Sequence, residues 1–251
     1  YERDLAAWLD GHGTGRVWEV PGSDFGNYRW GGTVDPALPG LIDRPYLARE
    51  LVPQGGPATV NLLNAIDRRM QEGWFEPSSL APIARLFGVG TVVARNDIEY
   101  ERYRLARLAF LDVDLRAALG EPAFQGPVIP DATRVAMLDP TFYARPDAPP
   151  SYPAVAAYNL DPSEPLVVSQ DAAHPVVLVG DGEGVVDLAA AGLIDGARPI
   201  VYAASDAAVA RRLEELGLTI STGTPQELGA FIWQEIETWT GVAQQAGIQE
   251  G

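Results

Sequence analysis

The chain has 251 residues, of which 34 are acidic and 18 basic, and its net charge is −16. Nucleic acids and anionic membrane surfaces attract basic proteins, so this charge argues against either as a partner. Cysteine is absent, which excludes disulfides and thiolate metal sites, and no window approaches the run of about 18 apolar residues that crosses a bilayer. Residues 1–4 lead into an amphipathic helix rather than a leader peptide, so we expect any membrane segment or export signal of the natural protein elsewhere.

The first half of the chain alternates between helical and strand patterns. Apolar spacing predicts a helix over 2–12, RVWEVP predicts a strand over 16–21 with Trp18 packed inside, and TVVAR predicts a buried strand over 91–95. Two helices are predicted between the strands, over 57–73 and 76–86. The order helix, strand, loop, helix, helix, strand is typical of an α/β fold.

The helix over 57–73 has the clearest pattern. Its apolar stripe consists of Val60, Leu63, Ile66 and Met70. Polar residues are expected away from that stripe: Asp67, Arg68, Arg69 and Gln71.

The long segment 22–50 is rich in glycine and proline and is predicted to be an ordered loop after the first strand. It combines aromatic, acidic and guanidinium side chains. Aromatic faces stack on sugars while Asp, Asn and Arg hydrogen-bond hydroxyl groups, so this mixture suits a polyhydroxylated ligand. The candidate ligand contacts in this loop are Asp24, Asn27, Tyr28, Arg29, Trp30, Asp43 and Arg44. The alternative is a surface loop whose charges pair with each other and whose aromatics pack locally.

Two expectations about this loop can be checked in a structure. Arg29 and Asp43 should share a polar cluster with Asp24 or Arg44, because a compact loop holds these four opposite charges. If the loop binds a sugar, Tyr28 or Trp30 should present a partly exposed ring face.

Asn96 and Asp97 follow the second predicted strand. If the two strands are parallel neighbours, these residues lie near Ser23 and Asp24, because the ends of parallel strands meet at one edge of a sheet. Two loops would then form one site, and Asn96 and Asp97 are added to the candidate contacts.

The second half is predicted to be a separate unit. The expected division is an α/β subdomain over 1–116 and a second α/β subdomain over 117–251, joined by a proline-rich region at 117–131 and 139–165 of irregular edge strands or linker. Strands are predicted over 176–179 and 199–202, with a helix over 185–193 between them.

No catalytic residue, metal site or cofactor is predicted. His12 and His174 lie in turn-like contexts, and no GxSxG elbow supplies a nucleophile. Asp112 and Asp114 in LDVDL have strand spacing, and an exposed polar face is favoured over a metal–nucleotide site. The GDGEG sequence at 180–184 could suggest a phosphate loop, but it lacks the required spacing and lysine, so a glycine turn is favoured.

Five ordered blocks carry a family resemblance: PGSDFGNYRWG, DRPYLARELVPQG, NLLNAIDRRMQEG, SLAPIARLFGVGTVVARNDIEYERYR and GDGEGVVDLAAAGLIDGARPIVYAAS. Together they resemble the soluble extracytoplasmic part of the actinobacterial alpha-(1->3)-arabinofuranosyltransferase family, over about residues 1–205. The resemblance implies a piece of a multi-spanning, lipid-phosphosugar-dependent glycosyltransferase that builds cell-wall arabinan. It also implies that the catalytic acid lies upstream, outside this chain, and that arabinan and the membrane portion of the parent protein are partners.

The block 206–251 is expected to depart from that family, because it resembles the C-terminal end of tripartite tricarboxylate transporter receptors. Thr224 and Pro225 predict the start of an amphipathic helix there, with Thr224 as N-cap.

The sequence therefore predicts a non-catalytic, extracytoplasmic domain that binds or positions arabinan. Three alternatives remain open: a receptor for a small carboxylate, a structural spacer, and a stand-alone glycoside hydrolase with two carboxylates drawn from Asp24, Asp35, Asp43 and Asp97.

Overall fold

The computed structural model divides into two compact units, Tyr1–Tyr202 and Ala203–Gly251, and each is described by itself. In the first unit the structure describes residues 1–51, 55–99, 108–130, 151–160, 169–170 and 173–202. In the second it describes residues 203, 211, 212, 214, 215, 233, 234 and 238. Of the helix predicted after Thr224, only Trp233, Gln234 and Thr238 are among the described residues, and all three are helical.

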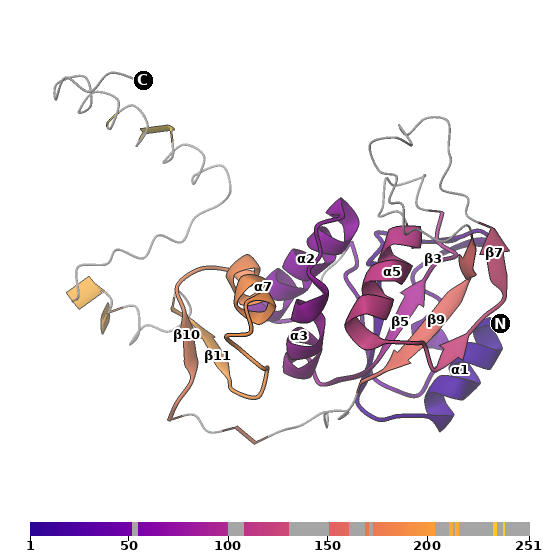
Figure 1. Ribbon diagram of the computed structural model, residues 1–251, viewed down its shortest axis with the longest axis horizontal. Coiled ribbons are helices and arrows are strands. Elements are labelled where there is room, and N and C mark those ends of the chain that lie inside the picture. Colours follow the sequence, from indigo (N-terminus) through magenta and orange to yellow (C-terminus); the bar gives the residue numbers. More distant parts are fainter. Residues whose placement is uncertain are drawn as a thin grey trace. The chain divides into compact units, whose positions relative to one another are not determined.

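A five-stranded mixed sheet forms the centre of the first unit, in the order β4-β1-β5-β9-β6. Figure 1 shows two of its strands, β5 and β9, side by side. Its strands are β4 (Tyr46–Leu47), β1 (Arg16–Val20), β5 (Val89–Arg95), β9 (Val155–Asn159) and β6 (Phe124–Gln125). β1 runs parallel to both β4 and β5, whereas β9 is antiparallel to β5 and to β6. The α/β class is confirmed. The two strands predicted in the first half are parallel neighbours, which is the condition on which Asn96 and Asp97 were placed near Ser23 and Asp24.

Helices cover both faces of this sheet. α1 (Glu2–Gly11) packs with Val17 and Val93 in the smaller apolar cluster. The larger cluster joins Trp18 and Val92, whose side chains point to the opposite face, to the remaining helices. These are α2 (Pro57–Glu72), α3 (Leu80–Leu86) after the short 3-10 helix η2 (Pro77–Ser79), α5 (Leu108–Leu119) and α7 (Gly182–Ala190). Because both faces are covered, all seven residues of β5 are buried.

The segment predicted as a loop over 22–50 has more regular structure than expected. It contains an antiparallel hairpin of β2 (Gly26–Tyr28) and β3 (Gly31–Val34), the 3-10 turn η1 (Leu38–Gly40) and the edge strand β4. The strands are only two to four residues long, so their glycine-rich sequence carries little strand signal. Val34 has φ of +63°, a conformation that is rare for a β-branched residue.

The proline-rich region also contributes to the core of the sheet. Residues 128–130 (β7) and 151–153 (β8) pair with each other, and β9 follows at once with four buried residues in a central position, not at an edge. The sheet thus includes strands from both sides of the boundary expected at residue 117, so a cut there would separate paired strands. The remainder of 139–165 lies outside the part of the chain that the structure describes.

The last elements of the first unit match their predictions closely. β10 (Val176–Leu178) and β11 (Ile200–Tyr202) form a parallel pair, and α7 lies between them in the chain. The predicted turn is present, with Gly180 at φ +155°. The Asp181 side chain caps α7 by accepting from the Glu183 amide, so a carboxylate already binds there and the phosphate-loop alternative is not supported.

The prediction of a strand through LDVDL is wrong, because these residues lie in α5. Leu111 and Leu115, four residues apart, are both buried, which is helical rather than strand periodicity. Asp112 is also buried and pairs with Arg116 at 2.9 Å, again with a spacing of four. Asp112 and Asp114 therefore do not share one strand face as a metal–nucleotide pair would require.

Candidate functional site

The most distinctive site lies where β1 and β5 end at their carboxyl edge. The rings of Trp30 and Tyr28 are stacked, 4.8 Å apart and within 3° of parallel. The Arg95 guanidinium lies over the Tyr28 ring, 4.3 Å from its centre. Arg95 is fully buried and Tyr28 is 3% exposed, whereas Trp30 is 46% exposed. An indole lies at the surface, with a phenol and then a buried cation beneath it.

Asp97 fixes this stack. One of its carboxylate oxygens, Oδ2, accepts hydrogen bonds from the Trp30 indole at 2.9 Å, from the Tyr1 hydroxyl at 2.8 Å and from Arg95 at 2.9 Å. The other oxygen accepts from Arg95 Nε at 3.0 Å. The Arg29 amide also donates to the Asp97 carbonyl at 2.8 Å. Asp97 is buried and its oxygens are occupied, so it positions Trp30 and is not open to a ligand.

Arg95 is surrounded by carboxylates beneath the stack. Its two terminal nitrogens donate to Glu2 at 2.9 and 2.8 Å, in addition to the bonds to Asp97. These charges hold the pKa of Arg95 well above its usual value despite burial. Glu19 is buried nearby, and desolvation raises its pKa to about 7, with Arg95 opposing that rise. The Glu19 Oε2 atom has no hydrogen-bond partner among the described residues.

Arg95 and Glu19 were missing from the sequence-based candidates, although the chain carries a signal for them. Each is a charged residue within a strand that is mostly apolar, RVWEV or VGTVVAR. Strand alternation places both on the face that packs against α1, where Glu2 meets Arg95. A buried charge needs a partner, so two opposite charges on one face of neighbouring strands could have been paired from the sequence.

Of the predicted loop residues, Asp24 belongs to a different network. It pairs with Arg49, which also binds Asp67 at 2.9 Å and the Gly22 carbonyl at 3.0 Å. Asp67 is 3% exposed, so it is not the solvent-facing residue that the helical pattern of 57–73 indicated. Arg69, also expected off the apolar stripe, is buried as well and joins α2 to α7 through Glu183 and Asp187.

Arg44 lies at the opposite end of β1. Its guanidinium donates to the carbonyls of Leu9, His12, Thr14 and Gly15 at 2.6 to 3.3 Å, and to the Thr91 hydroxyl at 3.0 Å. The amide of Asp43 donates to Asp10 in α1 at 3.0 Å. The single cluster predicted for Arg29, Asp43, Asp24 and Arg44 is therefore wrong. The segment 22–50 passes along β1, so Asp24 and Arg29 lie at the carboxyl end of that strand and Asp43 and Arg44 at its amino end.

The two asparagines are internal. Asn96 is fully buried and donates from Nδ2 to the Pro153 carbonyl at 2.9 Å. Asn27 is 9% exposed and its carbonyl accepts from the Glu99 amide at 3.0 Å. Both asparagines hold loops in place. The loop after β5 meets the segment after β1 at Arg29 and Trp30. Asp24, the neighbour expected for Asn96 and Asp97, instead pairs with Arg49.

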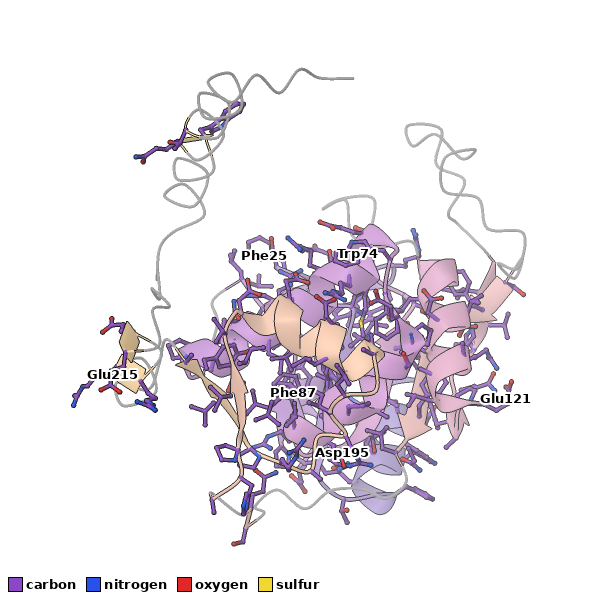
Figure 2. The ribbon with its side chains drawn as sticks, turned by 60° about the vertical axis from the view of Figure 1, so that its left-hand side comes forward. Phe25, Trp74, Phe87, Glu121, Asp195 and Glu215 are labelled. Atoms are coloured by element: carbon purple, nitrogen blue, oxygen red, sulfur yellow. The ribbon has the colours of Figure 1, made fainter. Side chains whose placement is uncertain are left out.

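Trp30 and Arg29 are thus the predicted residues that present exposed side chains beside the Asp97 network. Figure 2 shows two other exposed aromatics on the same unit, Phe25 and Trp74.

The arrangement does not suggest hydrolysis. Asp97 and Asp24 are held in separate ion pairs with Arg95 and Arg49, so neither is placed to activate a water between two carboxylates. His12 is exposed and stacks on Trp8 at 4.9 Å, and His174 is exposed. Within the described residues, no group of three or more metal-ligating side chains converges. The site is an aromatic shelf on an α/β domain: the exposed indole of Trp30, stacked on the buried ring of Tyr28 and bonded to Asp97.

Comparison with known proteins places this chain in a family. A family model described as alpha-(1->3)-arabinofuranosyltransferase, N-terminal GT-C domain, matches residues 1–231. The chain therefore belongs to the alpha-(1->3)-arabinofuranosyltransferase family. It is similar to the enzyme of that name from Mycolicibacterium smegmatis, with 33% identity over 64% of this chain. It is also similar to the one from Mycobacterium tuberculosis, with 32% identity over 68% of this chain.

A solved structure agrees with these relatives. The single-particle cryo-EM structure of arabinofuranosyltransferase AftD from mycobacteria matches 75% of this chain, with 25% identity and a TM-score of 0.60. The chain spans only 11% and 13% of the two curated relatives and 14% of the solved chain. The family match continues to residue 231, so much of the block 206–251 does not depart from the family as the sequence suggested. No helix among the described residues has the length and apolar character needed to cross a membrane.

Proposed function

We propose that this chain is a non-catalytic, extracytoplasmic domain of a membrane arabinofuranosyltransferase, and that it holds an acceptor arabinan for an active site in the membrane portion of the same protein. Family membership supports the connection with arabinofuranosyl transfer. The observation that carries the glycan-binding part is the exposed face of Trp30, backed by Tyr28.

Trp30 is suited to a sugar ring because it is both open and fixed. A stacking contact needs free aromatic area, and 46% of this residue is exposed. The hydrogen bond to Asp97 and the parallel contact with Tyr28 hold the indole in one orientation, so binding costs little side-chain entropy. Gly31, next in the chain, has open space around it, so backbone as well as ring is accessible to a ligand.

The test is a titration of short arabinofuranose oligosaccharides against the 251-residue chain by calorimetry. We expect saturable binding that Trp30→Ala weakens at least tenfold. Trp74→Ala is the matched control, because Trp74 is 42% exposed and follows the end of α2, where its ring lies against Arg69. Equal binding by the two variants would contradict the proposal, as would a large loss of melting temperature in Trp30→Ala alone.

The isolated chain is further expected to show no transfer from a lipid-linked arabinofuranose donor. Transfer of radiolabelled arabinofuranose to an oligosaccharide acceptor measures this directly. Turnover by the purified chain would make it an enzyme in its own right and would end the acceptor-positioning proposal.

A further inference from the structure

A cavity of about 300 Å³ opens at the amino end of β1 and β5, away from Trp30. It is bounded by the first turns of α2, the end of α3, the turn before β5, and β11. Its walls are mainly apolar, with Leu62, Leu86, Phe87, Val185 and Ile200. Figure 2 labels Phe87 at this place in the molecule. The volume is at the lower end of the roughly 300–1,000 Å³ typical of small-molecule sites.

The charge of this cavity is opposite to that of the chain. Two arginines, Arg16 and Arg85, line it, and none of its described lining residues is an aspartate or glutamate. This is unusual in a chain with 34 acidic and 18 basic residues. The Arg16 guanidinium beside apolar walls forms a local positive field in a medium that screens charge poorly.

Arg16 is held in position without being neutralised. Its Nη1 donates to the Phe87 carbonyl at 2.7 Å, and its backbone amide donates to Gly88 at 2.8 Å. Among the described residues it has no carboxylate partner. A guanidinium has five N–H donors, so most of its donors stay available while the bond to Phe87 fixes its plane. Arg85 differs: it donates to the Asp195 carbonyl, and the pKa of the Asp195 carboxyl is lowered by a backbone amide and by the charge of Arg85, so Arg16 is the cation on which the site depends.

A third polar group lies at the β11 side of the cavity. The Tyr202 hydroxyl is buried and has no hydrogen-bond partner among the described residues. A buried hydroxyl without a partner costs stability, and a ligand oxygen could satisfy it.

We propose that this cavity binds a small carboxylate with an apolar body. The carboxylate would accept hydrogen bonds from the Arg16 guanidinium, in the bidentate geometry that arginine favours, and the body would pack on Phe87, Leu62 and Ile200. The apolar walls distinguish such a ligand from inorganic phosphate, which has no apolar surface to bury. This site is separate from the Trp30 shelf and does not depend on glycan binding.

The experiment titrates 4-phenylbutyrate into the 251-residue chain by calorimetry, with 4-phenylbutan-1-ol and inorganic phosphate as comparison ligands. We expect the carboxylate to bind at least tenfold more tightly than the alcohol or phosphate. Arg16→Gln should weaken binding of the carboxylate about tenfold. Arg3→Gln is the matched control, since Arg3 is exposed on α1 and this substitution removes the same charge at a different place.

A second variant keeps the test valid if Arg16→Gln folds poorly. Ala58 is exposed in the first turn of α2 and lines the cavity, so Ala58→Trp should obstruct it and abolish binding without disturbing the core. Trp30→Ala should bind the carboxylate like the wild type. Equal affinity for acid and alcohol, equal affinity in the Arg16 and Arg3 variants, or no saturation below about 10 mM would each overturn the proposal.

Discussion

The two ends of β1 and β5 surround their guanidiniums with different partners. At the carboxyl end, Arg95 is enclosed by the carboxylates of Glu2 and Asp97, with Glu19 close by. At the amino end, Arg44 and Arg16 donate to backbone carbonyls, four in the case of Arg44 and one in the case of Arg16. Carbonyls satisfy hydrogen bonds but do not cancel a charge.

This difference assigns different roles to the two ends. At the carboxyl end the buried cation Arg95 is compensated by carboxylates, and the ring of Trp30 is exposed to solvent there beside Arg29. The amino end keeps positive charge and is open to an anion. Near Arg44 that charge is costly, since burial lowers the Arg44 pKa while Asp10 raises it.

The largest effect is expected from removing the ion pairs of Arg95 at the carboxyl end. Arg95→Met removes the cation and leaves buried Asp97 and Glu19 without compensation. Removing one member of a buried ion pair costs about 3–5 kcal/mol of unfolding free energy. Urea denaturation followed by circular dichroism measures this loss, and Arg3→Met on the exposed face of α1 serves as control. A loss no larger than that of the control would mean that the carboxylates are stable without the cation.

Glu19 predicts how that end responds to pH. Burial raises its pKa from 4.5 to about 7, so the folded chain binds a proton that the unfolded chain has released. The stabilisation is fully present below about pH 4.5 and is lost as the pH rises through about 7, on the order of 3 kcal/mol at 1.36 kcal/mol per pKa unit. Glu19→Gln should flatten this dependence.

The comparison is between unfolding free energies of wild type and Glu19→Gln from pH 4 to 8. Glu214→Gln, at an exposed position of the second unit, controls for the loss of one acid. Parallel pH profiles for wild type and Glu19→Gln would show that Glu19 is ionised in the folded chain throughout this range.

The close packing at the amino end predicts a third effect. A Cβ on Gly90 would lie 1.7 Å from the Thr14 carbonyl oxygen, the same oxygen that accepts from Arg44. Gly90→Ala must displace that backbone, at a cost of about 1–3 kcal/mol. Gly11→Ala, where nothing lies within 4 Å, should leave the melting temperature unchanged or higher. Similar melting temperatures for the two variants would rule out a close approach at Gly90.

Regular elements and local pairing were well specified by the sequence. The strands over 16–20 and 89–95, the helix over 57–72 and the β10–α7–β11 unit follow directly from apolar periodicity. The exposed indole of Trp30 was expected from its loop context. The destinations of charged groups were harder to predict, because Asp67, Arg69 and Arg95 are buried by partners up to 118 residues away in the chain. A charged side chain is expected to face solvent when only the sequence is considered. Its burial becomes evident only from its partners in the tertiary structure.

The Asp112 and Asp114 prediction failed for a related reason. A short pattern such as LDVDL fits a strand over five residues, but helical spacing becomes visible only when Leu111, Leu115 and Arg116 are considered together. The position of β9 could not be derived from its proline-rich surroundings, since its pairing with β5 is set by a strand more than 60 residues away.

The smallest expected effect tests the amino end most directly. Arg44→Lys keeps the charge but replaces a planar fork with one ammonium, which cannot reach carbonyls as far apart in the chain as Leu9 and Gly15. Lost hydrogen bonds should cost about 1 kcal/mol, measured by urea denaturation against Arg3→Lys. If Arg44 acts through these carbonyls, the cost should be the same in 0.05 and about 0.5 M salt, because the partners carry no net charge. A cost that vanishes at high salt would instead indicate that Asp10 is the main partner of Arg44. Both ends of the sheet would then compensate a guanidinium with a carboxylate.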